Sequence, residues 1–293
     1  LPLLSPLSSF SFPARLSFLR LREENEIMQR IRVAVAGARG RMGSLMAERI
    51  SNAEDMELVA AFDPRGGYVE GLKVSHPDEM EKVLDEAAPD VFVDFTNADA
   101  AVKNVKTAAG KKIKLVVGTT GFTQSQFEEM REAIERNGVP AVISPNFSIG
   151  VNVFWKLVAY AVKFLSEYHV EIVEMHHALK KDAPSGTALK AAEIVAQHLK
   201  SLGKECKIVH GRSGLVGERS QTEIGIHAIR AGDVVGEHTV IFATTGERLE
   251  ITHRAQSREA FANGAMLAIQ WVAEQSRAGI YSMDDVLSSV IRA

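Results

Sequence analysis

The residues with the clearest capacity for proton chemistry lie in one short segment, residues 174–187, which reads EMHHALKKDAPSGT. It contains two histidines and two lysines, His176, His177, Lys180 and Lys181. A histidine near its ordinary pKa can give or take a proton at neutral pH, and a nearby lysine adds positive charge or a second proton. The segment therefore predicts a site that binds an anion and moves a proton.

A predicted helix start directly after the lysines supports the same interpretation. Ser185 suits the N-cap position, which leaves the backbone N–H groups of Gly186 and Thr187 pointing outward. Such a helix start attracts a carboxylate. Adjacent histidines on a strand face opposite sides, and no cluster of carboxylates accompanies them, so we predict no metal site. Histidines and lysines that merely cover a surface are the alternative.

A second candidate is the glycine-rich segment GARGRMG, residues 37–43, between a strand-like run and a helix-like run. In such a turn Gly37 permits the sharp bend, Gly40 lets a pyrophosphate approach the backbone, and Gly43 lets the helix pack closely. Asp63 follows the next strand-like run about 20 residues later, where an acid binds the ribose hydroxyls of a dinucleotide. Glycine turns of this kind also occur without any ligand.

Other polar groups lie where they could reach the same ligand. Arg39, Arg41 and Arg65 could contact a 2′-phosphate or could be solvated surface charges. The turns at 118–121 (GTTG) and 144–147 (SPNF) each follow a strand-like run. Open α/β sheets bind ligands at the carboxyl ends of their strands, so both turns are expected to line one crevice with the glycine loop.

The elements that must position these groups form two patterns. In the first half strands alternate with helices, with strands at 31–36, 58–62, 91–95, 115–118 and 139–144 and helices at 44–51, 80–88, 98–109 and 124–137. This alternation predicts an α/β fold with a Rossmann-like, doubly wound parallel sheet. The second half predicts an α+β domain of antiparallel character, with helices at 151–165 and 185–199, strands at 170–175, 222–230, 234–243 and 248–254, and turns at 231–233 and 244–246. A last helix at 257–275 is expected to pack back on the first domain.

Composition sets the limits of these predictions. The 293 residues are 46% hydrophobic and 24% charged, which is typical of a globular chain with room for two domains. A net charge of −3 shows no basic excess for binding nucleic acid. The single cysteine, Cys206, excludes an intrachain disulfide and fits a reducing compartment. No apolar run is long enough to span a membrane, so we expect a cytoplasmic protein without a membrane partner.

Residues 1–27 differ from the rest of the chain. They are rich in Leu and Ser, carry three arginines and contain no acid before Glu23. An organellar targeting segment and an upstream extension that precedes a start at Met28 both fit, and we favour the second. We expect this segment to be disordered. The predicted domains are then 28–147 plus 256–293 for a dinucleotide, and 148–255 for a substrate.

Seven segments, taken together, resemble the bacterial dihydrodipicolinate reductases of lysine biosynthesis. They are AGARGRMG at 36–43, DFT at 94–96, GTTG at 118–121, NFSIGVN at 146–152, EMHHALKKDAPSGTAL at 174–189, RAGDVVGEHTV at 230–240 and ERLEITHRA at 247–255. The resemblance runs in order from about residue 31 to residue 275. The 174–189 segment is its most specific part.

The resemblance implies reduction of 4-hydroxy-tetrahydrodipicolinate, a small dicarboxylate, to tetrahydrodipicolinate with NADH or NADPH. By position, His176 is implied as the general acid/base, Lys180 as the proton donor and His177 as a substrate contact, while Gly186 and Thr187 would hold a carboxylate. The implied dinucleotide-binding residues are Gly37, Ala38, Arg39, Gly40, Arg41, Met42, Asp63, Gly118, Thr119, Thr120, Ser144, Pro145, Asn146 and Phe147. The second domain would also form a homotetramer.

One departure from the family pattern concerns the dinucleotide. Some members have arginine directly after the ribose-binding acid, whereas here Pro64 follows Asp63 and Arg65 comes one residue later. The preference between NADH and NADPH therefore stays open, and we expect both to be used. Two alternatives to the implied function are a related imine reductase or amino-acid dehydrogenase, and a non-catalytic protein that senses a dinucleotide.

Overall fold

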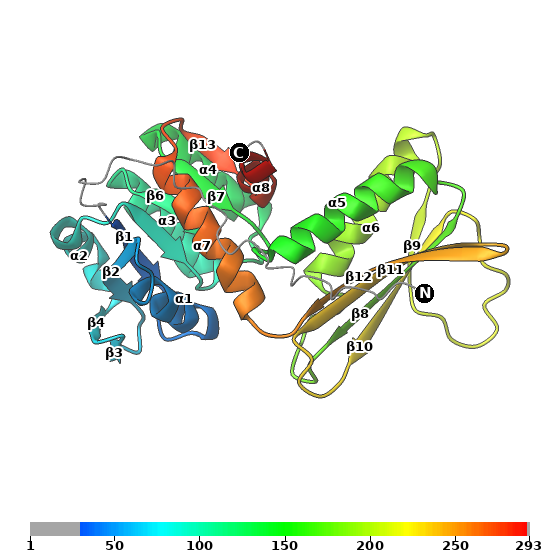
Figure 1. The fold of residues 1–293 in the computed structure, drawn as a ribbon, viewed down its shortest axis with the longest axis horizontal. Helices are drawn as coiled ribbons and strands as arrows, with labels where there is room; N and C mark the ends of the chain where they lie inside the picture. The colour runs from blue at the N-terminus through cyan, green and yellow to red at the C-terminus, as the bar shows by residue number, and fades with distance from the viewer. Residues whose placement is uncertain (1–29, 292–293) are drawn as a thin grey trace, which may run out of the picture.

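The computed structural model describes residues 30–291, so the segment 1–27 discussed above lies outside the described residues. Two lobes are visible in Figure 1, each built on its own sheet. The chain passes from the first lobe to the second before helix α5 (Ile149–Phe164) and returns through helix α7 (Glu259–Glu274) (Figure 1).

The first sheet has eight strands in the spatial order β13-β7-β6-β5-β1-β2-β4-β3. In chain order they are β1 (Ile31–Ala36), β2 (Met56–Phe62), β3 (Tyr68–Val69), β4 (Leu72–Ser75), β5 (Val91–Asp94), β6 (Lys114–Val117), β7 (Pro140–Ile143) and β13 (Gly279–Tyr281). All neighbours are parallel except the short β3–β4 pair at one edge. The order reverses between β1 and β5, and this switch point is where doubly wound sheets bind ligands.

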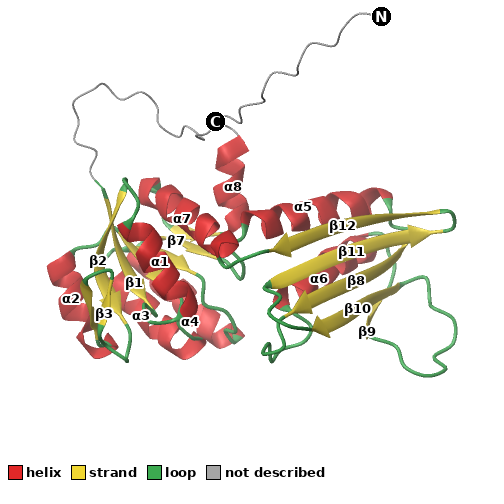
Figure 2. Cartoon of the chain, turned by 60° about the horizontal axis from the view of Figure 1, so that its bottom comes forward, coloured by secondary structure: helices red, strands yellow, loops and turns green. Residues whose placement is uncertain are grey.

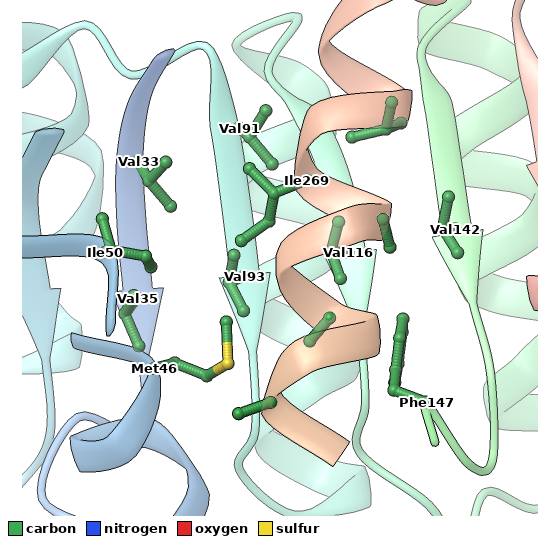
Figure 3. Packing of buried hydrophobic residues seen from close by; sticks show 14 of the residues in the cluster. Val33, Val35, Met46, Ile50, Val91, Val93, Val116, Val142, Phe147 and Ile269 are labelled. Atoms are coloured by element: carbon green, nitrogen blue, oxygen red, sulfur yellow. The ribbon is translucent and has the colours of Figure 1, made fainter. Parts of the chain in front are cut away.

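Helices cover both faces of this sheet. One face carries α1 (Arg41–Ser51), α7 (Glu259–Glu274) and α8 (Met283–Ile291), and the other carries α2 (Met80–Ala87), α3 (Ala98–Gly110) and α4 (Gln124–Asn137), with a short 3₁₀ helix (Pro77–Glu79) before α2. Figure 3 shows Ile269 of α7 packed among Val91, Val93 and Val116 of the sheet. The predicted Rossmann-like fold class is therefore confirmed.

The second sheet is mixed. Its five strands, in the order β12-β11-β8-β10-β9, are β8 (His169–His176), β9 (Lys207–His210), β10 (Glu223–Arg230), β11 (Gly236–Thr244) and β12 (Glu247–Ala255). Helices α5 (Ile149–Phe164) and α6 (Gly186–Ser201) pack on one face, and every second residue of β8 is buried beneath them. Among the described residues no helix covers the opposite face, which is turned forward in Figure 2.

The connections in the second sheet differ from a simple series of hairpins. β10 and β11 are not neighbours, because β8 lies between them, parallel to β10 and antiparallel to β11. Residues 231–233 do form a turn, but it passes around the end of β8: Ala231 N–H donates to the His176 carbonyl, and Ala178 N–H donates to the Gly232 carbonyl. The turn thus fixes the backbone on both sides of His177.

Several boundaries also differ from the sequence-based expectation. Helix α1 begins at Arg41 rather than at residue 44, so Arg41 and Met42 lie in its first turn. Strands β3, β4, β9 and β13 and helix α8 were not predicted. The four strands have only two to four residues each, too few for alternation to show in a sequence.

Helix α7 approaches the segment that follows β7 so closely that only glycine fits at one position. A Cβ added to Gly264 would lie 1.8 Å from the carbonyl oxygen of Phe147. The obstacle is backbone, which cannot rotate away as a side chain can. Gly264 thus sets the distance between α7 and the segment that leaves the first sheet.

We expect Gly264→Ala to lower the free energy of unfolding by about 1–3 kcal/mol, because the added methyl overpacks the α7 contact. Urea denaturation followed by circular dichroism measures this change. Gly110→Ala is the matched control, since that glycine is also helical and a Cβ there meets nothing within 4 Å. Equal midpoints for the two variants would contradict the close-approach explanation.

Candidate active site

The glycine loop joins β1, α1 and the end of β5 at van der Waals distance. Gly37 has φ +77°, and a Cβ on it would lie 2.4 Å from the carbonyl oxygen of Phe95. A Cβ on Gly43 would lie 2.0 Å from the carbonyl oxygen of Gly37. Both glycines are therefore needed by the backbone path itself, before any ligand is considered.

The start of helix α1 has the properties of a phosphate site. Its N-cap is Gly40, which supplies no side-chain cap, and its first turn contains no acidic residue. The first N–H groups of a helix have no partner within the helix, and together with the helix dipole they attract an anion. The glycine loop with Ala38, Arg39, Arg41 and Met42 around it therefore fits the pyrophosphate of a dinucleotide.

Asp63 lies beside this loop and is buried. Its carboxylate accepts hydrogen bonds from the backbone N–H groups of Arg39 and Arg65, each at 3.1 Å, and from the guanidinium of Arg65 at 2.8 and 2.9 Å. The Arg65 side-chain hydrogen bond is the main cause that lowers the pKa of Asp63, so this carboxyl is ionised at neutral pH. Pro64 does not prevent the contact, because the chain turns back at Arg65.

A buried acid, Asp94, holds the 118–121 turn in place, and the sequence analysis did not single it out. Asp94, at the end of β5, accepts hydrogen bonds from the hydroxyls of Thr119 (2.6 Å) and Thr96 (2.7 Å) and from the Asn104 amide (2.8 Å). Burial raises the pKa of Asp94, and these donors oppose the rise. The Thr119 hydroxyl is used inside the protein, so only the backbone of Thr119 is left for a ligand, beside Gly118 and the exposed Thr120.

The 144–147 turn leads from the first sheet toward the second domain. Asn146 donates from its amide nitrogen to the Thr187 hydroxyl at 3.2 Å, and its amide oxygen accepts from the Ser148 N–H at 2.9 Å. Ser144 donates to the Asn146 carbonyl at 2.9 Å, which stiffens the turn. Pro145 is exposed, whereas Phe147 is buried with its ring edge against Phe95.

Glu174, fully buried on β8, is the acid that the groups around the histidine–lysine segment contact. It accepts from His176 Nδ1 at 2.6 Å, from the Arg230 guanidinium at 2.8 and 2.9 Å, and from the Ser185 N–H at 3.0 Å. These donors lower the pKa of Glu174 despite its burial. For His176 burial is the larger effect and lowers its pKa, while the Glu174 carboxylate acts in the opposite direction.

His238 of β11 is a second buried histidine at the site. Its ring meets that of His176 edge to face, with the centroids 5.1 Å apart, and its Nε2 lies 2.8 Å from the Ser185 hydroxyl. That hydroxyl also accepts from the Ala188 N–H as the N-cap of α6. Burial lowers the pKa of His238 to about 3, which keeps it neutral.

The other predicted residues surround His176. Lys180 is mostly buried and its ammonium pairs with Asp182 at 2.8 and 2.9 Å rather than with a histidine. His177 leaves the strand after His176, and its Nδ1 is buried without a hydrogen-bond partner. At the α6 start Gly186 is exposed, and a Cβ there would meet nothing within 4 Å, so this side of the helix end is open.

Three residues at this site, Glu174, Arg230 and His238, were missed as site residues. Glu174 was detectable, because residues two apart on a strand share a face and His176 follows it by two. Arg230 and His238 come from strands more than 50 residues away in the sequence, so no local pattern could place them there.

Within residues 30–291 no group of three His, Cys, Asp or Glu side chains is arranged to hold a metal ion. None of the described helices is long and apolar enough to cross a membrane.

Comparison with known proteins gives consistent matches over both lobes. The family model for the dihydrodipicolinate reductase N-terminus matches residues 31–147, and that for the C-terminus matches residues 150–287. The 4-hydroxy-tetrahydrodipicolinate reductase of Methanocaldococcus jannaschii is 53% identical over 270 residues, covering 88% of this chain and 97% of the relative. That of Methanosarcina mazei is 49% identical over 267 residues, covering 88% and 99%.

A solved structure extends the likeness to three dimensions. The dipicolinate-bound dihydrodipicolinate reductase from Paenisporosarcina sp. TG-14 superposes with a TM-score of 0.69 at 28% identity, covering 87% of this chain and 98% of that chain. The resemblance inferred from the seven sequence segments is thereby confirmed. The chain is an oxidoreductase that belongs to the dihydrodipicolinate reductase family.

Proposed function

We propose that the protein reduces 4-hydroxy-tetrahydrodipicolinate to tetrahydrodipicolinate with NADH or NADPH, in the diaminopimelate route to lysine. The observation that carries this proposal is the pairing of two sites. A helix start without a side-chain cap lies at the switch point of the first sheet, and the His176–Glu174 pair lies beside the start of α6 on the second. Asn146 links the two through Thr187.

The second site suits a dicarboxylate that must gain a proton. The open start of α6 at Gly186 and Thr187 binds one carboxylate, and His177 contacts the bound molecule. The Asn146 amide donates to the Thr187 hydroxyl, so the hydroxyl proton of Thr187 is free for the substrate. A substrate carboxylate competes with Asp182 for Lys180 and so draws the ammonium into the cleft.

The reaction consumes one hydride and one proton and releases one water. When bound, the dinucleotide supplies the hydride, and the protein positions it. Lys180 and His176 deliver the proton, because the negative charge of a bound dicarboxylate raises the pKa of a histidine beside it. Closure of the lobes around residues 146 and 254 excludes water from the reacting atoms.

For the dinucleotide we assign the ribose hydroxyls to Asp63 and the pyrophosphate to the glycine loop, Ala38 to Met42. The turns at 118–120 and 144–147 hold the nicotinamide half. Arg65 serves a 2′-phosphate, since 62% of its side chain is exposed and its fork can turn outward from Asp63. Residues 28–147 with 256–293 form the dinucleotide domain in this proposal, and residues 148–255 form the substrate domain.

The uncovered face of the second sheet supports a homotetramer. Val173, Met175 and Ile241 lie half-buried on this face, beside a Thr239–Thr252 hydrogen bond of 3.0 Å. Apolar side chains on a sheet face without a helix call for a partner surface, and symmetric assembly supplies one. A cytoplasmic location accompanies this proposal, because the single cysteine fits a reducing compartment.

The assay that tests the activity couples a synthase that forms 4-hydroxy-tetrahydrodipicolinate to oxidation of NADH or NADPH, followed by absorbance. We expect turnover with both, and a loss of roughly 10²–10⁴-fold in kcat for His176→Ala and for Lys180→Ala. Dinucleotide affinity, measured by fluorescence, should stay near that of the parent protein. His169→Ala is the control, because His169 lies at the other end of β8 and contacts Gln221. Near-normal turnover in both site variants would overturn the assigned roles.

Replacing Arg65 tests the dinucleotide assignment. We expect Arg65→Ala to raise KM for NADPH about tenfold, because a charge-assisted contact to the 2′-phosphate is lost. KM for NADH should stay equal or fall, since Asp63 becomes free to accept from the ribose hydroxyls. Steady-state kinetics with each dinucleotide measure both values, and an equal rise in the two would exclude a role in phosphate binding.

The assembly is tested by Val173→Glu, which puts a charge in the middle of the uncovered sheet face. We expect the parent protein to sediment as a tetramer and the variant as a smaller species, because a buried unpaired charge destabilises the contact. Circular dichroism checks that the variant keeps its secondary structure. A parent protein that sediments as a monomer would refute the assembly.

A further inference from the structure

Glu174 is surrounded by hydrogen-bond donors whose purpose the proposed reaction does not by itself explain. Each carboxylate oxygen accepts two hydrogen bonds. One oxygen takes the Ser185 N–H and one Arg230 nitrogen, and the other takes His176 Nδ1 and the second Arg230 nitrogen. Four donors thus converge on two acceptor atoms in a place without solvent.

Only a carboxylate satisfies this arrangement. A glutamine of the same shape has one acceptor oxygen and one NH₂ group, so in either orientation its NH₂ would face a donor nitrogen. Leaving buried donors without acceptors is costly, and this holds most strongly for a charged guanidinium. The site therefore requires the charge of Glu174 as well as its length.

The same contacts settle which nitrogen of His176 carries the proton. An ionised carboxylate only accepts, so His176 Nδ1 carries a hydrogen and donates it to Glu174. The exchangeable position of the neutral ring is then Nε2. A Cβ added to Gly236 would lie 3.1 Å from this nitrogen, so the glycine at the start of β11 leaves room beside it.

We propose that Glu174 is a positioning residue for the reaction proposed above: its carboxylate holds His176 in the Nδ1–H tautomer, so that Nε2 alone exchanges a proton with the substrate. Arg230 anchors the carboxylate and also donates to the Asp182 carbonyl at 2.6 Å, in the loop that carries Lys180. Through the Ser185 N–H the same carboxylate sets the start of α6. One acid thus fixes the proton donor and the carboxylate site relative to each other.

Four charged or titratable groups face His176. They are Glu174 on β8, Lys180 in the following loop, Arg230 on β10 and His238 on β11. Lys180 and Arg230 lower the pKa of His176, and Glu174 raises it. Removing the carboxylate charge therefore lowers the pKa of His176 further.

The test uses the full-length protein with ¹⁵N-labelled histidine. In the parent protein we expect the nitrogen shifts of His176, assigned by loss of its signals in His176→Asn, to show the Nδ1–H tautomer. In Glu174→Gln we expect a fall of about one unit in the pKa of His176, or a change of tautomer. We also expect a loss of roughly tenfold or more in kcat. KM for the dinucleotide should not change, because Glu174 lies on the other lobe.

Glu171→Gln is a matched control. Glu171 lies on the same strand three residues earlier, on the opposite face, and it also binds two arginines and a histidine, Arg212, Arg219 and His227. Removing the Glu171 charge should leave the tautomer and pKa of His176 unchanged. A general effect of removing a paired acid from β8 would appear in both variants.

Two results would overturn the proposal. One is an Nε2–H tautomer of His176 in the parent protein, which stays decisive even where Glu174→Gln does not fold. The other is a folded Glu174→Gln protein with the parent tautomer, pKa and kcat. If instead the parent shows the expected tautomer but no reductase activity, the proposed function fails while the positioning by Glu174 stands.

Discussion

The burial of one ionised carboxylate, that of Glu174, is the constraint on which the second domain depends. Its charge has to be neutralised where no water reaches it, and the neutralising groups come from three separate segments. β10 must lie next to β8 to bring Arg230, and α6 must begin where Ser185 can donate its N–H. A sheet with β10 and β11 paired as a hairpin would leave only one of them beside β8, so either Arg230 or His238 would be separated from the Glu174–His176 pair. The mixed strand order and the site are therefore consequences of the same requirement.

The first domain depends instead on the close approach of backbone segments to one another. Its key positions, Gly37, Gly43 and Gly264, would each bring a Cβ within 2.5 Å of a backbone carbonyl. Absence of a side chain lets β1, α1 and the end of β5 meet near the switch point, and lets α7 approach the segment after β7. Gly40 in turn leaves the start of α1 without a side-chain cap. The buried acids of this domain are Asp63 and Asp94, and each accepts hydrogen bonds from neighbouring donors.

The sequence was most informative where the structure is local. The βα units of the first domain have buried strands followed by amphipathic helices, so their type and order could be predicted. Gly138 ends α4 with φ +65°, and Ser185 caps α6 through the Ala188 N–H, both as their residue types indicate. Strands β9 and β13 could not be predicted, because pairing with a distant strand defines them. Arg230 and His238 likewise reach His176 only through the order of strands in the sheet.

The entry and exit of the second domain lie side by side. His253 near the end of β12 lies over Gly150 in the first turn of α5, where an added Cβ would approach the ring to 2.9 Å. The second domain is thus an insertion with adjacent ends, and the first domain is discontinuous in the chain. During synthesis the ribosome releases residues 149–255 before α7, which fills one face of the first core. The inserted domain can therefore complete its fold first, while the first domain is completed only after the last helices emerge.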